Sequence, residues 1–230
     1  MTQLSTAASS GRSWSADLVA RAAQLGASTV HEAAGRIGAL PSAITALYRD
    51  QPSLAGPAAT VLCPDGDNLW LHRAIYDAAP GSVLVAEVGS GEDYGYWGEI
   101  MATAALERGI AGLVISGCVR DAVQMQQLGF PVFSTGTCIR GTVKDPQRPG
   151  AIGARLRLGD VGVSPGDLVV GDADGVVVVP AAEAEQAVAA GEARERKEAG
   201  VMEQLRAGGT TLDIFGLPVP VQVSAGAEAR

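Results

Sequence analysis

The stretch Trp97–Asp121 constrains the fold most, because its pattern predicts a helix, a turn, a buried strand and a tight turn that opens another helix. Gly98–Arg108 has alanine-rich helical spacing, and the glycine that follows is a typical helix end. Ala111–Ile115 is a short apolar run typical of a buried strand. A helix of about ten residues rises roughly 15 Å, and a strand of about six residues covers roughly 20 Å. A strand that returns alongside the helix therefore brings Gly117–Asp121 next to Glu99.

Three charged side chains meet in this arrangement, namely Glu99, Arg120 and Asp121. Each acid also lies at the N-terminus of a predicted helix, where free N–H groups and the helix dipole favour anions. Carboxylates suit a hard divalent cation, while a guanidinium and helix N–H groups suit an anionic ligand. The stretch therefore predicts a metal-assisted site for an organic acid.

Composition and charge limit the class of protein. The chain has 230 residues, of which 47% are hydrophobic and 18% charged, as expected for one globular domain with appendages. The net charge of -8 argues against a nucleic-acid partner, because phosphate binding needs clustered Lys and Arg. No apolar run is long enough to span a bilayer, so we expect no membrane partner. Residues 1–14 lack the hydrophobic segment of a secretion signal, and we expect them to form a flexible N-terminus.

The cysteines indicate the cellular compartment. Cys63, Cys118 and Cys138 are odd in number and scattered, and their spacing matches neither a disulfide framework nor a zinc motif. Buried, reduced thiols are the simpler interpretation. We therefore expect a cytoplasmic protein.

The order of elements predicts a layered domain. Ala58–Cys63 and Ser82–Val88 are near-continuous apolar runs, typical of strands covered on both faces. From Ala154 to Val179 the pattern changes to short strands separated by Pro-Gly and Asp-Gly turns. Helices alternate with strands before this point, so we expect an α/β or α+β layered domain over residues 15–180. Residues 181–230 are predicted to form a long charged helix and a tail at a subunit interface.

The predicted site also resembles a known family, the RraA-like family. Gly98-Glu99, followed about twenty residues later by Arg120-Asp121, is similar to the acid, gap, Arg-Asp signature of that family. The resemblance extends over most of the chain. Its other parts are His31–Arg36, Asn68–Pro80, Gly171–Gly175 and Leu212–Gly216, of which the last is similar to the tail of the aldolase branch.

This resemblance implies a fold and a function. The family contains divalent-metal aldolases that cleave 4-hydroxy-4-methyl-2-oxoglutarate and 4-carboxy-4-hydroxy-2-oxoadipate, releasing pyruvate, and that also decarboxylate oxaloacetate. It also contains the RraA-type inhibitors of ribonuclease E. The implied fold is a three-layer β/β/α swivelling domain, with residues 15–180 as the catalytic domain. The implied assembly is a homotrimer or homohexamer.

The other residues of the chain favour metal catalysis over the alternatives. Aldol cleavage must stabilise an enolate, either with a lysine Schiff base or with a metal. The only lysines, Lys144 and Lys197, lie in a proline-flanked loop and in a charged helix, so neither resembles a desolvated amine. The only histidines, His31 and His72, are predicted to pack or cap on helix faces, which leaves no base for a Ser or Cys nucleophile.

The resemblance implies a role for each residue of the site. Asp121 binds Mg²⁺ or Mn²⁺ directly, and Glu99 holds metal-associated water that can carry protons. Arg120 pairs with the keto or enolate oxygen of the 2-oxo acid, where charge develops in the transition state. The N–H groups implied to bind the substrate carboxylate belong to Gly98, Glu99, Ile100 and Met101.

Some features of the site stay open. Glu99 stands where several aldolases of this type have Asp, and the extra methylene alters the predicted water network. The far carboxylate of a branched substrate needs a cation, for which Arg36, Arg140 and an Arg of a neighbouring subunit are alternatives. In an oligomer, Glu195 or Glu198 of a neighbouring subunit would also reach the metal site.

Two other interpretations compete with the enzyme. In one, Arg120 and Asp121 only cap a helix and pair on the surface. In the other, the chain is a regulatory protein that binds and inhibits ribonuclease E by docking an acidic surface on a basic partner. The intact Arg-Asp pair and the added C-terminal helix favour the enzyme.

Overall fold

Eight strands form one curved sheet in the computed structural model, which describes residues 14–89 and 93–221. In spatial order, the strands are β1 (Thr45–Ala46), β5 (Val132–Ser134), β4 (Gly112–Ile115), β3 (Val83–Val88), β2 (Leu54–Cys63), β9 (Leu168–Asp172) and β10 (Gly175–Val179), with β6 (Ala151–Ile152) beside β2. The two ends of this path, β1 and β10, contact each other, so the sheet nearly closes on itself.

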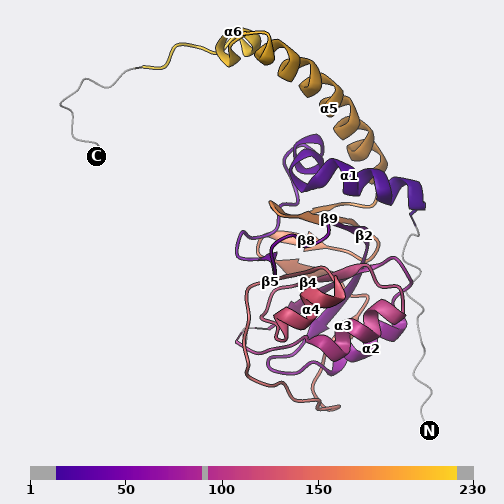
Figure 1. Cartoon of the computed structure of the whole chain (residues 1–230). Helices are drawn as coiled ribbons and strands as arrows, with labels where there is room; N and C mark the ends of the chain where they lie inside the picture. The colour runs from indigo at the N-terminus through magenta and orange to yellow at the C-terminus, as the bar shows by residue number, and fades with distance from the viewer. Residues whose placement is uncertain (1–13, 90–92, 222–230) are drawn as a thin grey trace, which may run out of the picture. The chain divides into compact units, whose positions relative to one another are not determined.

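Strands β2 to β5 are parallel and are joined by helices. These helices are α2 (Leu69–Asp77), α3 (Glu99–Glu107) and α4 (Ala122–Leu128), and Figure 1 shows them together on one side of the strands. Successive side chains of a strand point to opposite faces. Leu84 and Ala86 accordingly pack under the helices, while Val83 and Val85 face the inside of the curved sheet. The apolar run of β3 is explained by this burial on both faces.

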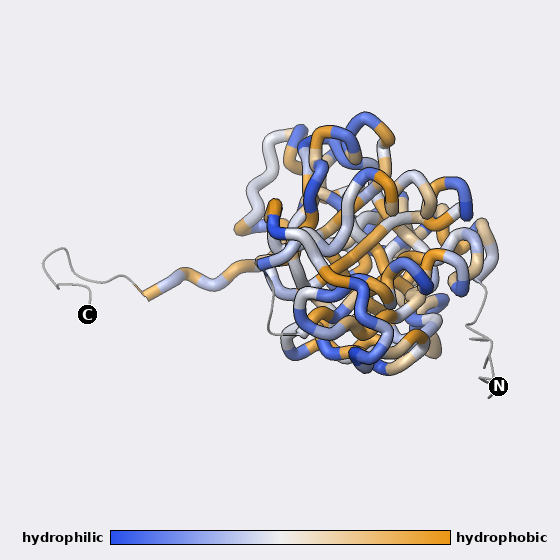
Figure 2. Tube along the Cα trace, turned by 90° about the horizontal axis from the view of Figure 1, so that it is seen from below, coloured by the Kyte–Doolittle hydropathy of each residue, from blue (hydrophilic) through white to orange (hydrophobic). Residues whose placement is uncertain are grey.

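The second half of the sheet is antiparallel and closes the interior. Strand β2 leaves β3 at its N-terminal end and pairs there with β9, which forms a hairpin with β10. A short ribbon of β7 (Leu156–Leu158) and β8 (Val161–Val163) adds Leu156 and Leu158 to the interior core. Gly171 is required by close packing, because a Cβ there would lie 2.8 Å from the Phe133 ring. Figure 2 shows hydrophobic stretches of the chain crossing the middle of the view.

Helix α1 (Ala16–Ala33) covers the outer face of β9 and β10. Its Leu18, Ala22 and Val30 pack against β9, β10 and the start of α5, and each fully buried Val or Leu contributes roughly 1.5–3 kcal/mol of transfer free energy. Gly26 (φ 75°) interrupts the helix with a backbone conformation that glycine adopts without strain. Helices α2 to α4, the sheet and helix α1 thus form successive layers. The layered α/β class predicted from the sequence is confirmed.

The C-terminal region is a separate compact unit. The chain divides into Met1–Glu192 and Ala193–Arg230. Helix α5 (Ala184–Arg206) begins in the first unit, where Arg21 Nε lies 2.6 Å from Glu192 Oε1. The second unit holds the rest of α5 and α6 (Thr211–Phe215), and none of its described residues is buried. Over residues 14–89 and 93–221, no helix is long and apolar enough to cross a membrane.

Candidate active site

A pocket of about 190 Å³ lies where the parallel strands end. The turns after β2, β3, β4 and β5 all contribute to it, because parallel strands present their carboxyl ends at the same edge of the sheet, the usual ligand site of such sheets. Its lining consists of Asn68, His72, Gly95, Tyr96, Trp97, Gly98, Ile100, Met101, Arg120, Asp121, Gly141, Thr142 and Lys144.

The Asp121 carboxylate is bound to the N-terminus of a neighbouring helix. Asp121 has a left-handed backbone (φ 59°) and begins α4 without capping it through its side chain. Its Oδ2 instead accepts a 3.1 Å hydrogen bond from the main-chain N–H of Glu99 in α3. A Cβ at Gly98 would lie 2.3 Å from this same Oδ2, so a residue without a side chain is needed here. The carboxylate therefore lies at the positive end of the α3 dipole.

Arg120 is held at the same edge of the pocket. Its main-chain N–H donates to Trp97 O at 2.8 Å, and its Nε lies 3.7 Å from Asp121 Oδ2. A Cβ at Gly95 would approach the Arg120 side chain to 3.1 Å, so the β3–α3 turn packs closely on this arginine. The side chains of Arg120 and Asp121 are 48% and 39% exposed, and both remain accessible to a ligand.

The four predicted N–H donors at the start of α3 differ in their hydrogen bonds. The Glu99 N–H donates to Asp121 Oδ2, and the Met101 N–H donates to Gly98 O at 3.1 Å. Within the described part of the chain, the N–H groups of Gly98 and Ile100 have no hydrogen-bond partner. These two are therefore available to an anionic ligand at the helix N-terminus. The Glu99 side chain is exposed at the same helix start.

The lining residues that were not predicted for the site include Asn68, His72 and Lys144. The first two belong to the β2–α2 turn and α2, and Lys144 follows β5. Burial, and then the charge of Lys144, lower the pKa of His72 below its ordinary value. All three residues follow the carboxyl end of a parallel strand, as Asp121 does. Ligands of such sheets bind at this edge, so this position along the chain is the signal by which they could have been predicted.

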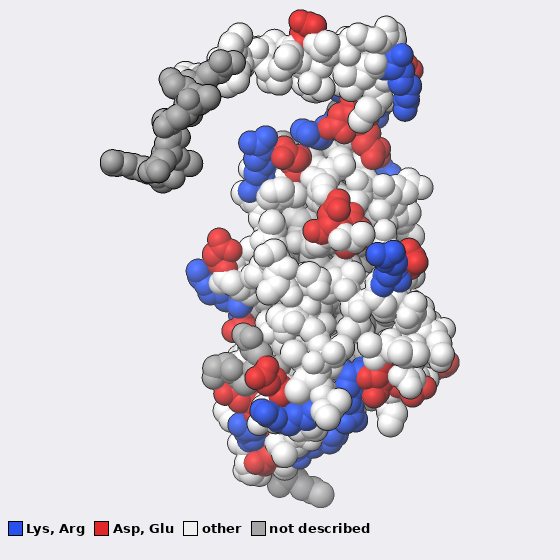
Figure 3. All heavy atoms as spheres, turned by 60° about the vertical axis from the view of Figure 1, so that its left-hand side comes forward, with Lys and Arg blue, Asp and Glu red and all other residues white. Residues whose placement is uncertain are grey.

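The other charged residues considered for the site are not part of this lining. Arg36 pairs with Glu32 at 3.1 Å, and Arg140 stacks on the Tyr94 ring with its guanidinium carbon 5.1 Å from the ring centre. Glu198 pairs with Arg194 at 2.7 Å on α5, where Glu195 is exposed. His31 contacts Ile37 O at 3.0 Å just after α1. The face in Figure 3 shows acidic and basic side chains interspersed with uncharged surface.

The donor set of the pocket fits a hard divalent cation. In the described ranges 14–89 and 93–221, no three His, Cys, Asp or Glu side chains gather as a ligand cluster. Mg²⁺ and Mn²⁺ do not need such a cluster, because one carboxylate, water and ligand oxygens can complete octahedral coordination. Asp121 offers one partly exposed carboxylate, and the pocket beside it has room for water and a small acid.

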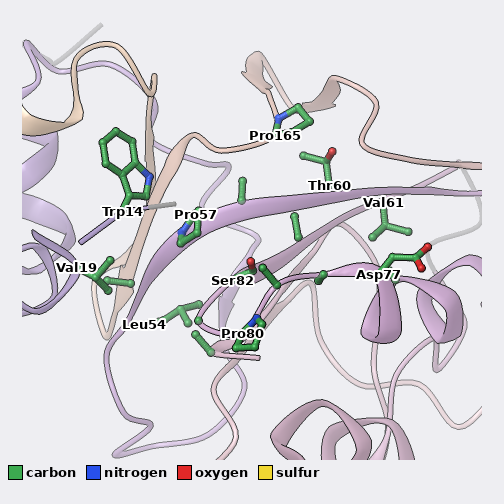
Figure 4. A pocket seen from close by; sticks show the side chains of 18 of the residues that line it. Trp14, Val19, Leu54, Pro57, Thr60, Val61, Asp77, Pro80, Ser82 and Pro165 are labelled. Carbon is green, nitrogen blue, oxygen red and sulfur yellow. The ribbon is translucent and has the colours of Figure 1, made fainter. Parts of the chain in front are cut away.

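A larger pocket, of about 530 Å³, lies at the opposite end of the parallel strands. Figure 4 shows its mostly apolar lining, which includes Trp14, Leu54 and Pro80. Asp77 is its one lining carboxylate among the described residues, and no cation lines it there. The smaller pocket is therefore the better candidate for acid chemistry, despite its size.

Comparison with known sequences identifies relatives of the chain. The RraA-like family (Aldolase/RraA) matches residues 16–178. A protein of Halalkalibacterium halodurans named "Putative 4-hydroxy-4-methyl-2-oxoglutarate aldolase" is 38% identical over 125 residues, which cover 54% of this chain and 59% of that protein. A protein of the same name from Shewanella oneidensis is 31% identical over 117 residues, or 51% and 70% of the two chains. The chain thus spans about three-fifths of the first relative's length.

Solved structures share the fold over most of the chain. A Pseudomonas syringae protein described as uncharacterized superposes with a TM-score of 0.74 at 28% identity, covering 86% of this chain and 92% of that one. Streptomyces coelicolor RraAS2, described as an unusual member of the RNase ES inhibitor RraA protein family, has a TM-score of 0.72 at 28% identity, covering 83% and 98%. The fold class implied by the sequence resemblance is thereby confirmed.

Proposed function

The chain belongs to the RraA-like family, and from that membership we propose that it is a divalent-metal-dependent aldolase releasing pyruvate from a branched 4-hydroxy-2-oxo acid. The observation that carries the proposal is the meeting of the Asp121 carboxylate, the Arg120 guanidinium and the α3 N-terminus at one pocket. The proposed substrates are 4-hydroxy-4-methyl-2-oxoglutarate and 4-carboxy-4-hydroxy-2-oxoadipate. The names of the Halalkalibacterium and Shewanella relatives support the first of them.

The proposed reaction breaks the bond between C3 and C4 of the substrate. The C4 hydroxyl loses its proton and becomes the carbonyl of one product. The bonding electron pair passes to C3 and is delocalised onto the C2 oxygen as an enolate, and protonation of C3 then gives pyruvate. The negative charge on the C2 oxygen is the charge that appears in the transition state, so an effective site places positive groups there.

The residues of the pocket match this requirement. Arg120 would donate to the C2 oxygen, and the free N–H groups of Gly98 and Ile100 would bind the C1 carboxylate. Asp121 would hold the divalent cation, which when bound supplies Lewis-acid stabilisation of the enolate. We propose that Glu99, whose exposed side chain lies at the same helix start, relays the proton from the C4 hydroxyl.

Decarboxylation of oxaloacetate is proposed as a second activity of this site. Loss of CO₂ from C4 leaves the same pyruvate enolate, so the same positive groups would stabilise it. A homotrimer or homohexamer, a cytoplasmic location and the lack of a nucleic-acid partner stay predictions.

Release of pyruvate, coupled to lactate dehydrogenase, tests the proposal. Each proposed substrate and oxaloacetate would be supplied with Mg²⁺, with Mn²⁺ and with a chelator. We expect release that depends on the metal and stops on chelation. A protein that is folded by circular dichroism but releases no pyruvate from any of the three substrates would overturn the proposal.

A regulatory role is the alternative, and the likeness to RraAS2 is the observation that supports it. In that case the protein would bind ribonuclease E and slow its cleavage of RNA. A pull-down with purified ribonuclease E, followed by an RNA cleavage assay, tests this role. Binding and inhibition that persist in an Arg120→Ala variant would separate it from the proposed catalysis.

A further inference from the structure

The segment that carries Lys144 is fixed against the β2–α2 turn. The Val143 N–H donates to Gly66 O at 2.8 Å, and the Asn68 N–H donates to Val143 O at 3.2 Å. One residue beyond Lys144, the Asp145 N–H donates to Asp67 Oδ2 at 2.7 Å, and Asp67 is fully buried. Main-chain bonds on both sides of Lys144 therefore hold its backbone in place beside the pocket.

The charge of Lys144 acts on His72 across the pocket wall. Burial is the first cause of the lowered pKa of His72, and the charge of Lys144 is the second. A lowered pKa disfavours the charged form of His72, so its imidazole adds little positive charge to the pocket near pH 7. The cationic group on this wall is the ammonium of Lys144, while Arg120 provides the guanidinium beside Asp121.

Two of the arginines considered for the far carboxylate, Arg36 and Arg140, are engaged elsewhere. Arg36 pairs with Glu32, and Arg140 stacks on Tyr94, and neither lines the pocket. Lys144 and Arg120 are the two cationic side chains that line it within the described residues. A ligand with a negative group at each end can therefore be bound by Arg120 at one end and by Lys144 at the other.

Asn68, another lining residue, is held by the β3–α3 turn. Its Nδ2 donates to Tyr96 O at 2.8 Å, which fixes the orientation of the amide, because the opposite orientation would bring two oxygens together. Its Oδ1 is buried and has no hydrogen-bond partner among the described residues. Asn68 itself is 5% exposed, so this amide is a fixed part of the pocket lining.

We infer that Lys144 is the specificity-determining residue for the carboxylate on C4 of the substrate. This inference rests on the proposed aldolase function. It assigns the two ends of the substrate to two cations, Arg120 at the C2 oxygen and Lys144 at the far carboxylate. His72 and Thr142 complete the polar wall around the far end.

A pair of substrates that differ at one group tests the inference. 4-Hydroxy-4-methyl-2-oxoglutarate carries the C4 carboxylate, and 4-hydroxy-4-methyl-2-oxopentanoate has a methyl group in its place. In Lys144→Met, kcat/KM for the first should fall roughly 10- to 100-fold, as expected for the loss of a charged hydrogen bond, with little change for the second. Lys144→Arg should restore much of the activity on the dicarboxylate. The control Arg73→Met removes an exposed charge next to His72 outside the pocket and should leave both rates unchanged.

A binding measurement separates this inference from the proposed function. Calorimetry would compare 2-oxoglutarate with 2-oxopentanoate, its analogue that ends in methyl, on the wild type and on Lys144→Met in the presence of Mg²⁺. We expect the wild type to prefer 2-oxoglutarate and the variant to lose that preference. Pyruvate release can fail while the wild type still prefers 2-oxoglutarate and Lys144→Met loses that preference. In that case the carboxylate subsite at Lys144 is supported and the aldolase function is wrong. If Lys144→Met lowers both substrates equally or leaves the preference intact, the inference is wrong while the aldolase stands.

Discussion

The main-chain N–H of Glu99 donates a 3.1 Å hydrogen bond to Oδ2 of Asp121, 22 residues further along the chain. This bond joins the first turn of α3 to the turn after β4, and it orients the carboxylate at the edge of the pocket. The dipole and the N–H group of a helix N-terminus both attract the negative charge of such a carboxylate. The geometry is suited to holding a cation on the other side of the carboxylate.

Gly98→Ala tests whether this geometry matters for activity. The new Cβ would lie 2.3 Å from Asp121 Oδ2 and 3.2 Å from Arg120 Cγ, so both side chains must move. Gly98 has an extended backbone (φ -162°) that alanine also adopts, so we expect folding to be retained. Misplacement by about 1 Å costs on the order of 100-fold, and kcat/KM should fall by that much with little change in Tm. Gly200→Ala, where nothing lies within 4 Å, is the matched control. Full activity in Gly98→Ala would show that the Asp121 position is unimportant.

Asp121→Asn tests the metal assignment. The amide can still accept from the Glu99 N–H, so the fold and the local hydrogen bond are preserved while the charge is removed. We expect calorimetric binding of Mn²⁺ to be lost and pyruvate release to fall about 1,000-fold, since metal stabilisation is worth several kcal/mol. Asp77→Asn, an exposed acid at the end of α2, should change neither. Mn²⁺ binding that survives in Asp121→Asn would assign the metal to another residue.

The part of the site that could be predicted from the sequence lies within one continuous helix–strand unit, α3 and β4. A helix followed by a returning strand already specifies that Glu99 and Asp121 lie near each other, because helix length and strand length are both fixed by backbone geometry. Lys144 and Asn68 come from turns after other strands. Their approach depends on the order of strands in the sheet and on the bonds of Val143 to the β2–α2 turn, which no local pattern specifies. The catalytic roles of all these residues stay predictions.

The limits of strand prediction have similar causes. The predicted strand at Ala58–Cys63 begins earlier in the structure, at Leu54, although Gly56-Pro57 is a typical turn signal. Pro57 lies where β2 changes its partner from β9 to β3, a place where a missing N–H is tolerated. Strands β1 and β6 have two residues each, which is too short for an alternating pattern to be recognised.

Thiol reactivity tests the burial of the cysteines. Burial raises the pKa of Cys63 to about 12, and Cys118 is also buried, whereas Cys138 is partly exposed. The thiolate is the reactive form, so at pH 8 we expect one thiol to react with Ellman's reagent in the native protein and all three after unfolding. Cys138→Ser should abolish the native reaction. Rapid native reaction of that variant would place Cys63 or Cys118 at the surface.

The titration of His72 tests its proximity to Lys144. In Lys144→Met we expect the pKa of His72 to rise toward its ordinary value of about 6.5 without reaching it, because burial, the larger cause of the lowered pKa, remains. A lowered pKa means that the unfolded chain binds the proton more readily, so the wild type loses stability as the pH falls below about 6.5, and the variant should lose less. NMR titration of the ring protons measures the pKa, with His31→Gln to assign the two histidines. An unchanged His72 pKa in Lys144→Met would mean that the ammonium does not act on this wall of the pocket, and the assignment of Lys144 to the far carboxylate would lose its electrostatic support.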